Sequence, residues 1–131
     1  MAVARLSRLA RHSHTFDDLT FSQSSALVRI MQREPLTLQE LAESEGITPP
    51  SMLKTVQSLV ELGYVTRRPH ETDGRKQLLE ITEQGHRAIG EIRERRDAWM
   101  QERLAQLSDD EMTLLRAALP AMRRLTERDD V

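Results

Sequence analysis

Apolar residues along this chain recur mostly at helical spacing, and in one stretch they change to the spacing of strands. Six segments carry an apolar stripe on one helical face, at about residues 3–14, 21–33, 38–45, 49–62, 83–106 and 109–125. Residues 64–67 and 77–81 are instead typical of two strands. Asp73-Gly74 between them is a strong signal for a tight turn. The pattern predicts a mainly α protein with one small β-hairpin.

Local signals agree with these helix boundaries. Three capping boxes, in which Ser or Thr precedes Glu or Gln by three residues, begin three helices: Thr20 with Gln23, Thr37 with Glu40, and Ser108 with Glu111. Another helix begins at Thr48, with Pro49 at its first position. Gly46 and Gly63 end the two helices of the middle region.

The two middle helices are short and joined by a tight link at Gly46-Ile47. This is the plan of the helix-turn-helix, whose second helix enters the major groove of DNA. One side of the second helix is apolar. The other side carries side chains suited to base edges and phosphates: Ser51, Lys54, Thr55, Gln57 and Ser58. The segment 48–62 is therefore a candidate recognition helix.

The hairpin that follows has a basic tip. Its four bases are Arg67, Arg68, Arg75 and Lys76, against Glu71 and Asp73. An arginine at such a tip can enter the neighbouring minor groove, where the negative potential is strongest. The alternative is that these arginines are ordinary solvated strand residues and that Asp73-Gly74 is only a turn. Their position after a recognition helix favours DNA binding, and Arg75 is the residue that discriminates.

Composition limits the classes of protein that remain. The 131 residues suit one domain, and the net charge of −2 argues neither for nor against nucleic acid. The absence of cysteine excludes disulfides, Cys-ligated zinc and thiol chemistry. No run of about 18 apolar residues is present, and the N-terminus lacks the apolar region of a secretory signal, so we expect a cytoplasmic protein.

Enzymatic and metal chemistry find no support in the motifs. The chain has no nucleophile elbow, phosphate loop or dinucleotide fingerprint, so we expect no enzyme and no cofactor. His12 and His14 are two residues apart and would not face each other on a helix. We therefore expect no metal site.

A set of spaced motifs closely resembles the MarR (multiple antibiotic resistance regulator) family. These are Leu38-Gln39-Glu40-Leu41-Ala42, Gly46-Ile47-Thr48, residues 59–67 (LVELGYVTR), Asp73-Gly74-Arg75 and residues 81–85 (ITEQG). The resemblance covers nearly the whole chain. It implies a winged helix-turn-helix flanked by N- and C-terminal dimerisation helices. It also implies that Arg75 reaches the minor groove and that Asp73 holds this arginine or the wing backbone in place.

The resemblance further implies one MarR-like domain over residues 1–131, with a DNA-binding lobe at 20–81 and a connecting helix at 82–107. Such a protein would bind a pseudo-palindromic operator as a homodimer, with repression as the default. Family members often have a basic residue where this chain has Ser58. We therefore expect a larger share of the phosphate affinity to come from the hairpin.

Residues 1–15 and 105–128 would form the dimer interface by the same resemblance. The expected contacts are apolar: Leu6, Leu9, Leu107, Leu115, Leu119, Met122 and Leu125. The alternative is that the last stripe belongs to an intramolecular core. A terminal helix in so small a chain has little to pack against, which favours the dimer.

Two points stay open. Similar proteins bind small aromatic or drug-like effectors, and Phe16, Phe21 and Trp99 could line such a pocket, although large aromatic residues are more often core. The rival to DNA binding is a winged-helix module that binds protein, which the slightly acidic net charge leaves open.

Overall fold

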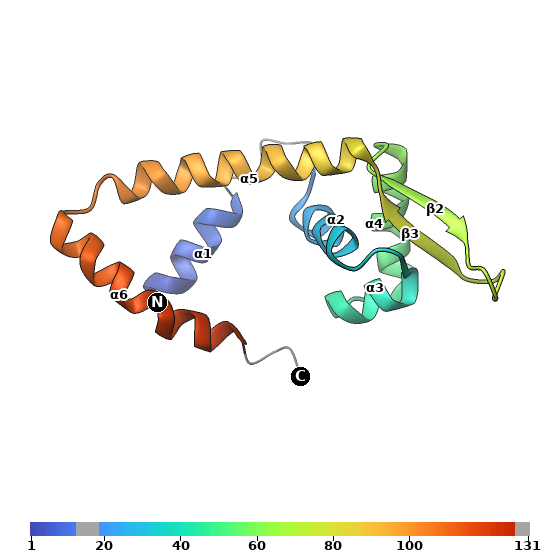
Figure 1. The fold of residues 1–131 in the computed structure, drawn as a ribbon, viewed down its shortest axis with the longest axis horizontal. Helices are drawn as coiled ribbons and strands as arrows, with labels where there is room; N and C mark the ends of the chain where they lie inside the picture. The colour runs from blue at the N-terminus through green and yellow to red at the C-terminus, as the bar shows by residue number, and fades with distance from the viewer. Residues whose placement is uncertain (13–18, 128–131) are drawn as a thin grey trace. The chain divides into compact units, whose positions relative to one another are not determined.

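The computed structural model describes residues 1–12 and 19–127, which form two compact units, Met1–Arg96 and Asp97–Val131. The first unit contains α1 (Ala2–His12), α2 (Phe21–Arg33), β1 (Leu36–Thr37), α3 (Leu38–Glu45), α4 (Pro49–Glu61), β2 (Val65–Pro69), β3 (Gln77–Ile81) and the first part of α5 (Glu83–Leu104) (Figure 1). The second unit contains the end of α5 and α6 (Asp109–Thr126). Each unit is described by itself.

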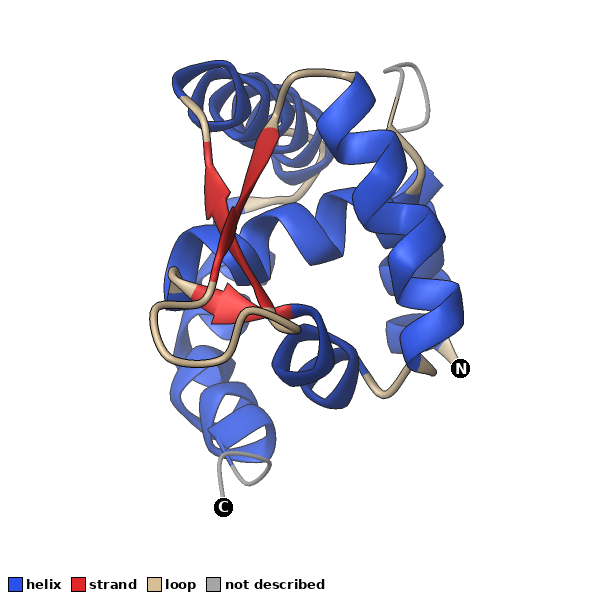
Figure 2. Ribbon diagram, turned by 90° about the vertical axis from the view of Figure 1, so that its right-hand side faces the viewer, coloured by secondary structure: helices blue, strands red, loops and turns tan. Residues whose placement is uncertain are grey.

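The predicted helices and hairpin are all present. Residues 13 and 14, the predicted end of the first helix, lie outside the described residues. A small strand, β1, was not predicted: it pairs with β3 and gives an antiparallel sheet in the order β1-β3-β2 (Figure 2). A strand of two residues is too short to show any alternation in the sequence. Its second residue, Thr37, is also the N-cap of α3.

The core of the first unit lies where α2, α3, α4 and the sheet meet. Met52, Val56 and Leu59 are fully buried on the inner face of α4, at the spacing of one helical stripe. They pack in one cluster with residues of the other elements, among them Leu27, Ile30, Leu41, Val65 and Leu79. Burial of one stripe fixes which face of α4 remains outside.

The cap predictions are confirmed with one exception. All three capping boxes form in both directions, and Gly46 adopts the left-handed conformation (φ 64°) that ends α3. Thr48 is the N-cap residue of α4, but its side chain caps no backbone amide. Its hydroxyl donates instead to the Ser51 hydroxyl at 3.1 Å. Pro49 at the start of α4 lacks an N–H, so the helix begins with one donor fewer to satisfy.

A tight junction joins the end of α4 and the start of β2 to the start of α5. The Thr82 hydroxyl donates to the Gly63 carbonyl at 2.6 Å and accepts from the Gly85 amide at 3.0 Å. The Thr82 amide donates to the Tyr64 carbonyl at 3.0 Å. A Cβ at Gly85 would clash with that same Tyr64 carbonyl oxygen and would lie 2.6 Å from Cγ1 of Ile81. The family-like spacing Ile-Thr-x-x-Gly thus reflects a close approach of two backbone segments.

In the second unit, α6 buries none of its residues. Exposed leucines and a methionine instead line it, as described below. Among the described residues, no helix is both long and apolar enough to cross a membrane.

We predict that Gly85→Ala lowers the free energy of unfolding by about 1–3 kcal/mol, because the new methyl group would clash with the backbone carbonyl of Tyr64. Gly90→Ala is the matched control on the same helix, where an added Cβ meets nothing described within 4 Å. It should raise stability by about 0.5–1 kcal/mol. Urea denaturation of the three proteins measures both effects, and equal stabilities would contradict the close approach.

Candidate nucleic-acid interface

The residues of α4 that are predicted to contact DNA differ in their exposure. Ser51, Lys54 and Gln57 are exposed, whereas Thr55 and Ser58 are half-buried. The Ser58 hydroxyl donates to the Lys54 carbonyl of its own helix at 3.1 Å. These residues therefore offer one cation and several neutral hydrogen-bonding groups. Glu61 is also exposed at the end of the helix.

The hairpin forms the wing predicted beside this helix. Strands β2 and β3 pair from Val65↔Ile81 to Pro69↔Gln77, and residues 70–76 form the tip. Two backbone hydrogen bonds close the tip: the His70 amide donates to the Lys76 carbonyl, and the Lys76 amide donates to the Asp73 carbonyl, both at 3.0 Å. The tip is thus an ordered turn.

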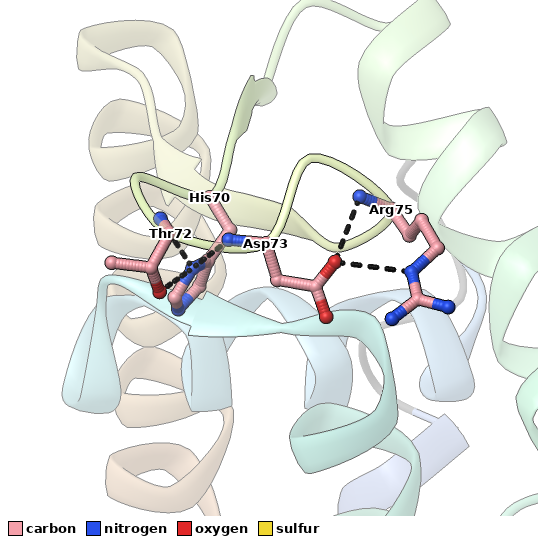
Figure 3. Close-up of polar contacts among 4 residues, drawn as sticks. All are labelled: His70, Thr72, Asp73 and Arg75. Atoms are coloured by element: carbon pink, nitrogen blue, oxygen red, sulfur yellow. Dashed lines mark hydrogen bonds and ion pairs between the residues drawn. The ribbon is translucent and has the colours of Figure 1, made fainter.

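Asp73 contacts both the backbone and the side chain of Arg75. Its Oδ1 accepts from the Arg75 amide at 3.1 Å and from Arg75 Nε at 3.3 Å (Figure 3). The Arg75 side chain nevertheless stays 92% exposed. This ion pair uses Nε and leaves the outer edge of the guanidinium directed to solvent, where a phosphate or a groove could meet it.

The two neighbouring arginines of β2 lie on opposite faces of the sheet, because side chains alternate along a strand. Arg68 forms an ion pair with Glu80 on β3, with 2.6 Å between Nε and Oε1. Arg67 stands opposite Leu79, on the face that looks toward α4. Only Arg67 of this pair shares a surface with Arg75 and Lys76.

A cavity of about 310 Å³ lies between the wing and α4. Arg67, Arg75 and Lys76 line it from the wing, and Pro49 and Leu53 line it from α4. Sequence reasoning missed Leu53, because an apolar residue in an amphipathic helix is assigned to the core by default. In the structure Leu53 is 37% exposed.

The structure describes two of the three residues proposed for an effector pocket. Phe21 lines a cavity of about 490 Å³ with residues of α1, α2 and α5, and the Arg11 guanidinium lies 5.2 Å from the centre of its ring. Trp99 belongs to the second unit, where Arg103, one helical turn on, lies 5.0 Å from its ring centre. Phe16 lies outside the described residues.

The residues predicted for a dimer interface are mostly exposed in the single chain. Leu6 and Leu9 on α1, and Leu115, Leu119, Met122 and Leu125 on α6, each expose at least a third of their surface. Leu107, between α5 and α6, is half-buried. Among the described residues, no cluster of three side chains could hold a metal ion.

Comparison with known proteins points to one family. Residues 17–76 match the family model described as "MarR family". An HTH-type transcriptional regulator of Mycobacterium tuberculosis is 37% identical over 127 residues, which cover 97% of this chain and 89% of the relative.

Two solved structures illustrate the similarity of fold. The crystal structure of RV1404 from Mycobacterium tuberculosis is 26% identical and superimposes with a TM-score of 0.82, over 99% of this chain and 90% of that one. A mutant of S. aureus MepR bound to an oligodeoxyribonucleotide is 21% identical, with a TM-score of 0.74 over 96% of this chain and 93% of that one.

The helix-turn-helix, the basic wing and the extent of the sequence similarity lead to one assignment. The relatives are named as transcriptional regulators, which are not enzymes. This chain belongs to the MarR family of winged helix-turn-helix transcriptional regulators.

Proposed function

We propose that this protein is a sequence-specific repressor that binds a pseudo-palindromic operator as a homodimer. One observation carries the proposal: beside the polar outer face of α4, Asp73 accepts a hydrogen bond from Nε of Arg75, while the Arg75 side chain stays almost fully exposed. In this proposal α4 reads the major groove and Arg75 enters the adjacent minor groove. The MepR mutant of similar fold, bound to an oligodeoxyribonucleotide, supports a DNA ligand.

The distribution of charge supports different roles for α4 and the wing in binding DNA. Lys54 is the one cation on the outer face of α4, and Glu61 offsets it. Arg67, Arg75 and Lys76 share one surface of the wing. We assign sequence reading to Ser51, Lys54, Gln57 and neighbouring Thr55 and Ser58, and most phosphate attraction to the wing. Arg68, paired with Glu80, contributes mainly to sheet stability.

The exposed stripe of α6 supports the homodimer. Leu115, Leu119 and Met122 recur at helical spacing, and α6 buries no residue within the single chain. A contiguous apolar stripe of this kind marks an interaction surface. A second copy of the chain would bury it and would bring two recognition helices to successive major grooves.

The proposal includes a small effector that binds the protein and releases it from DNA. The cavity beside Phe21 is large enough for a small aromatic molecule, and the side chains of Arg11 and Arg96 at its lining would favour an anionic one.

A protein that works on chromosomal DNA would operate in the bacterial cytoplasm. The alternative function remains a module that binds another protein instead of DNA.

The first experiment is a titration of a labelled duplex from upstream of the protein's own gene, at about 50 and about 200 mM salt. We expect binding that survives unrelated competitor duplex and that weakens steeply with salt, because several phosphate contacts release counterions. Equal weak binding to both duplexes would contradict specific binding at this site. Genome-wide capture of bound DNA would then separate a distant operator from a protein-binding module.

We predict that Arg75→Ala weakens binding to the operator by about 1–3 kcal/mol and reduces the salt dependence. Arg93→Ala is the matched control, because Arg93 is exposed on α5 and its loss changes the net charge equally. Fluorescence anisotropy with the same duplex measures both variants. Similar losses in the two proteins would mean that only the total charge matters, and the wing assignment would be wrong.

We predict that Leu119→Glu weakens dimerisation by roughly tenfold or more, because a carboxylate would be buried without a partner. Ala117→Glu places the same charge two residues away, about on the opposite side of α6, and should leave the dimer intact. Sedimentation equilibrium over a range of concentrations gives both constants. A monomeric wild-type protein, or equal effects of the two changes, would contradict this interface.

A further inference from the structure

His70 occupies the first position of the wing tip, directly after β2. Its ring Nδ1 lies 3.2 Å from the backbone nitrogen of Thr72 and 3.2 Å from that of Asp73, and both amides donate to it (Figure 3). The Thr72 hydroxyl lies 3.2 Å from the same ring nitrogen. One side-chain atom thus accepts hydrogen bonds from the two amides that begin the turn.

The hydrogen bonds of the tip form a continuous chain from His70 to Arg75. Nδ1 of His70 accepts from the amide of Asp73, and the carboxylate of Asp73 accepts from the amide and Nε of Arg75. The ring therefore positions the residue that positions the exposed arginine. Neither contact depends on the apolar core, because His70 and Asp73 are only half-buried and Arg75 is exposed.

The acceptor role requires a particular state of the imidazole. A backbone amide can only donate, so Nδ1 must carry a lone pair and the ring proton must be on Nε2. When Nδ1 takes up a proton, it can still donate to the Thr72 hydroxyl, which accepts as well as donates. The two amides, however, lose their acceptor and face a third N–H.

We propose that His70 is the positioning residue of the wing, and that its neutral ring orders the turn that presents Arg75 to DNA. DNA affinity should consequently fall once the pH is low enough for Nδ1 to take up a proton. The proposal rests on the DNA-binding function proposed above, and it adds a residue for which the sequence motifs gave no role.

The wing carries other charged groups besides His70. Those of the tip are Glu71, Asp73, Arg75 and Lys76, and the preceding strand pair contributes Arg68 and Glu80. All of them remain present when only residue 70 is changed, as do the other three histidines of the chain. A difference between pH profiles of position-70 variants therefore belongs to residue 70.

Two substitutions separate the acceptor from its titration. His70→Asn places a carbonyl oxygen two bonds from Cβ, as Nδ1 is, and asparagine makes this kind of turn without titrating. His70→Phe keeps an aromatic ring but removes the acceptor. We measure the affinity of wild type and both variants for the duplex used above, by anisotropy between about pH 5.5 and pH 8.

We expect wild-type affinity to fall by about three- to tenfold toward the acidic end, the effect of losing one or two neutral hydrogen bonds. His70→Asn should keep the wild-type affinity of the alkaline end at every pH. His70→Phe should show the weakened affinity throughout. Parallel profiles for wild type and His70→Asn would overturn the proposal. So would a wild-type affinity that rises toward acid, since the imidazolium would then be a phosphate contact.

Nitrogen-15 NMR of the free wild-type protein tests the wing without DNA and without any variant. The proposal requires an unprotonated Nδ1 on His70 at alkaline pH, with the Thr72 and Asp73 amide signals shifting as the ring titrates. A proton on Nδ1 in the neutral ring would overturn it. If no duplex is bound by any of the proteins, the DNA-binding function fails, while this spectrum still decides the role of His70.

Discussion

The junction around Thr82 is the constraint on which the geometry of the DNA-binding lobe depends. One threonine bonds to Gly63 and Gly85 through its hydroxyl and to Tyr64 through its amide, so that the end of α4, the start of β2 and the start of α5 meet at one point. Gly85 permits this meeting because it has no Cβ to strike the Tyr64 carbonyl. A recognition helix and a wing are useful together only if their separation is fixed, and the junction anchors the common end of both.

Beyond that anchor, the wing is ordered by local hydrogen bonds more than by the core. Val65 and Leu79 bury the base of the hairpin, whereas the tip depends on His70, Asp73 and two backbone hydrogen bonds. Such a segment opens more easily than the core, because few apolar contacts would be lost. The position of Arg75 therefore depends on two polar side chains, His70 and Asp73, rather than on apolar packing.

The division of charge between helix and wing gives an acidic protein a local basic surface. The whole chain carries a net charge of −2, yet Arg67, Arg75 and Lys76 share one cavity lining with the start of α4. Arg68 does not belong to that surface, because it lies on the other face of the sheet and forms an ion pair with Glu80 there. Net charge is therefore a poor guide to the partner of this protein, since the distribution of the bases decides what the surface attracts.

Much of this protein was determined by sequence alone. Each helix, the hairpin and three capping boxes were predictable, because caps, helical stripes and Asp-Gly turns act over a few residues. The two-residue strand β1 was not, because it depends on pairing with β3 across a long stretch of chain. The ion pair of Arg68 with Glu80, which leaves only Arg67 on the surface that faces α4, depends likewise on the register of β2 and β3. The exposure of Leu53 beside the wing was likewise decided only by tertiary structure. The acceptor role of His70 is local, because its partners lie two and three residues further along the chain, but no sequence motif signalled it. For the strand, the arginines and Leu53 the physical reason is the same: a sequence pattern records the preferences of near neighbours, whereas the surroundings of a side chain are set by which distant segments the fold brings together.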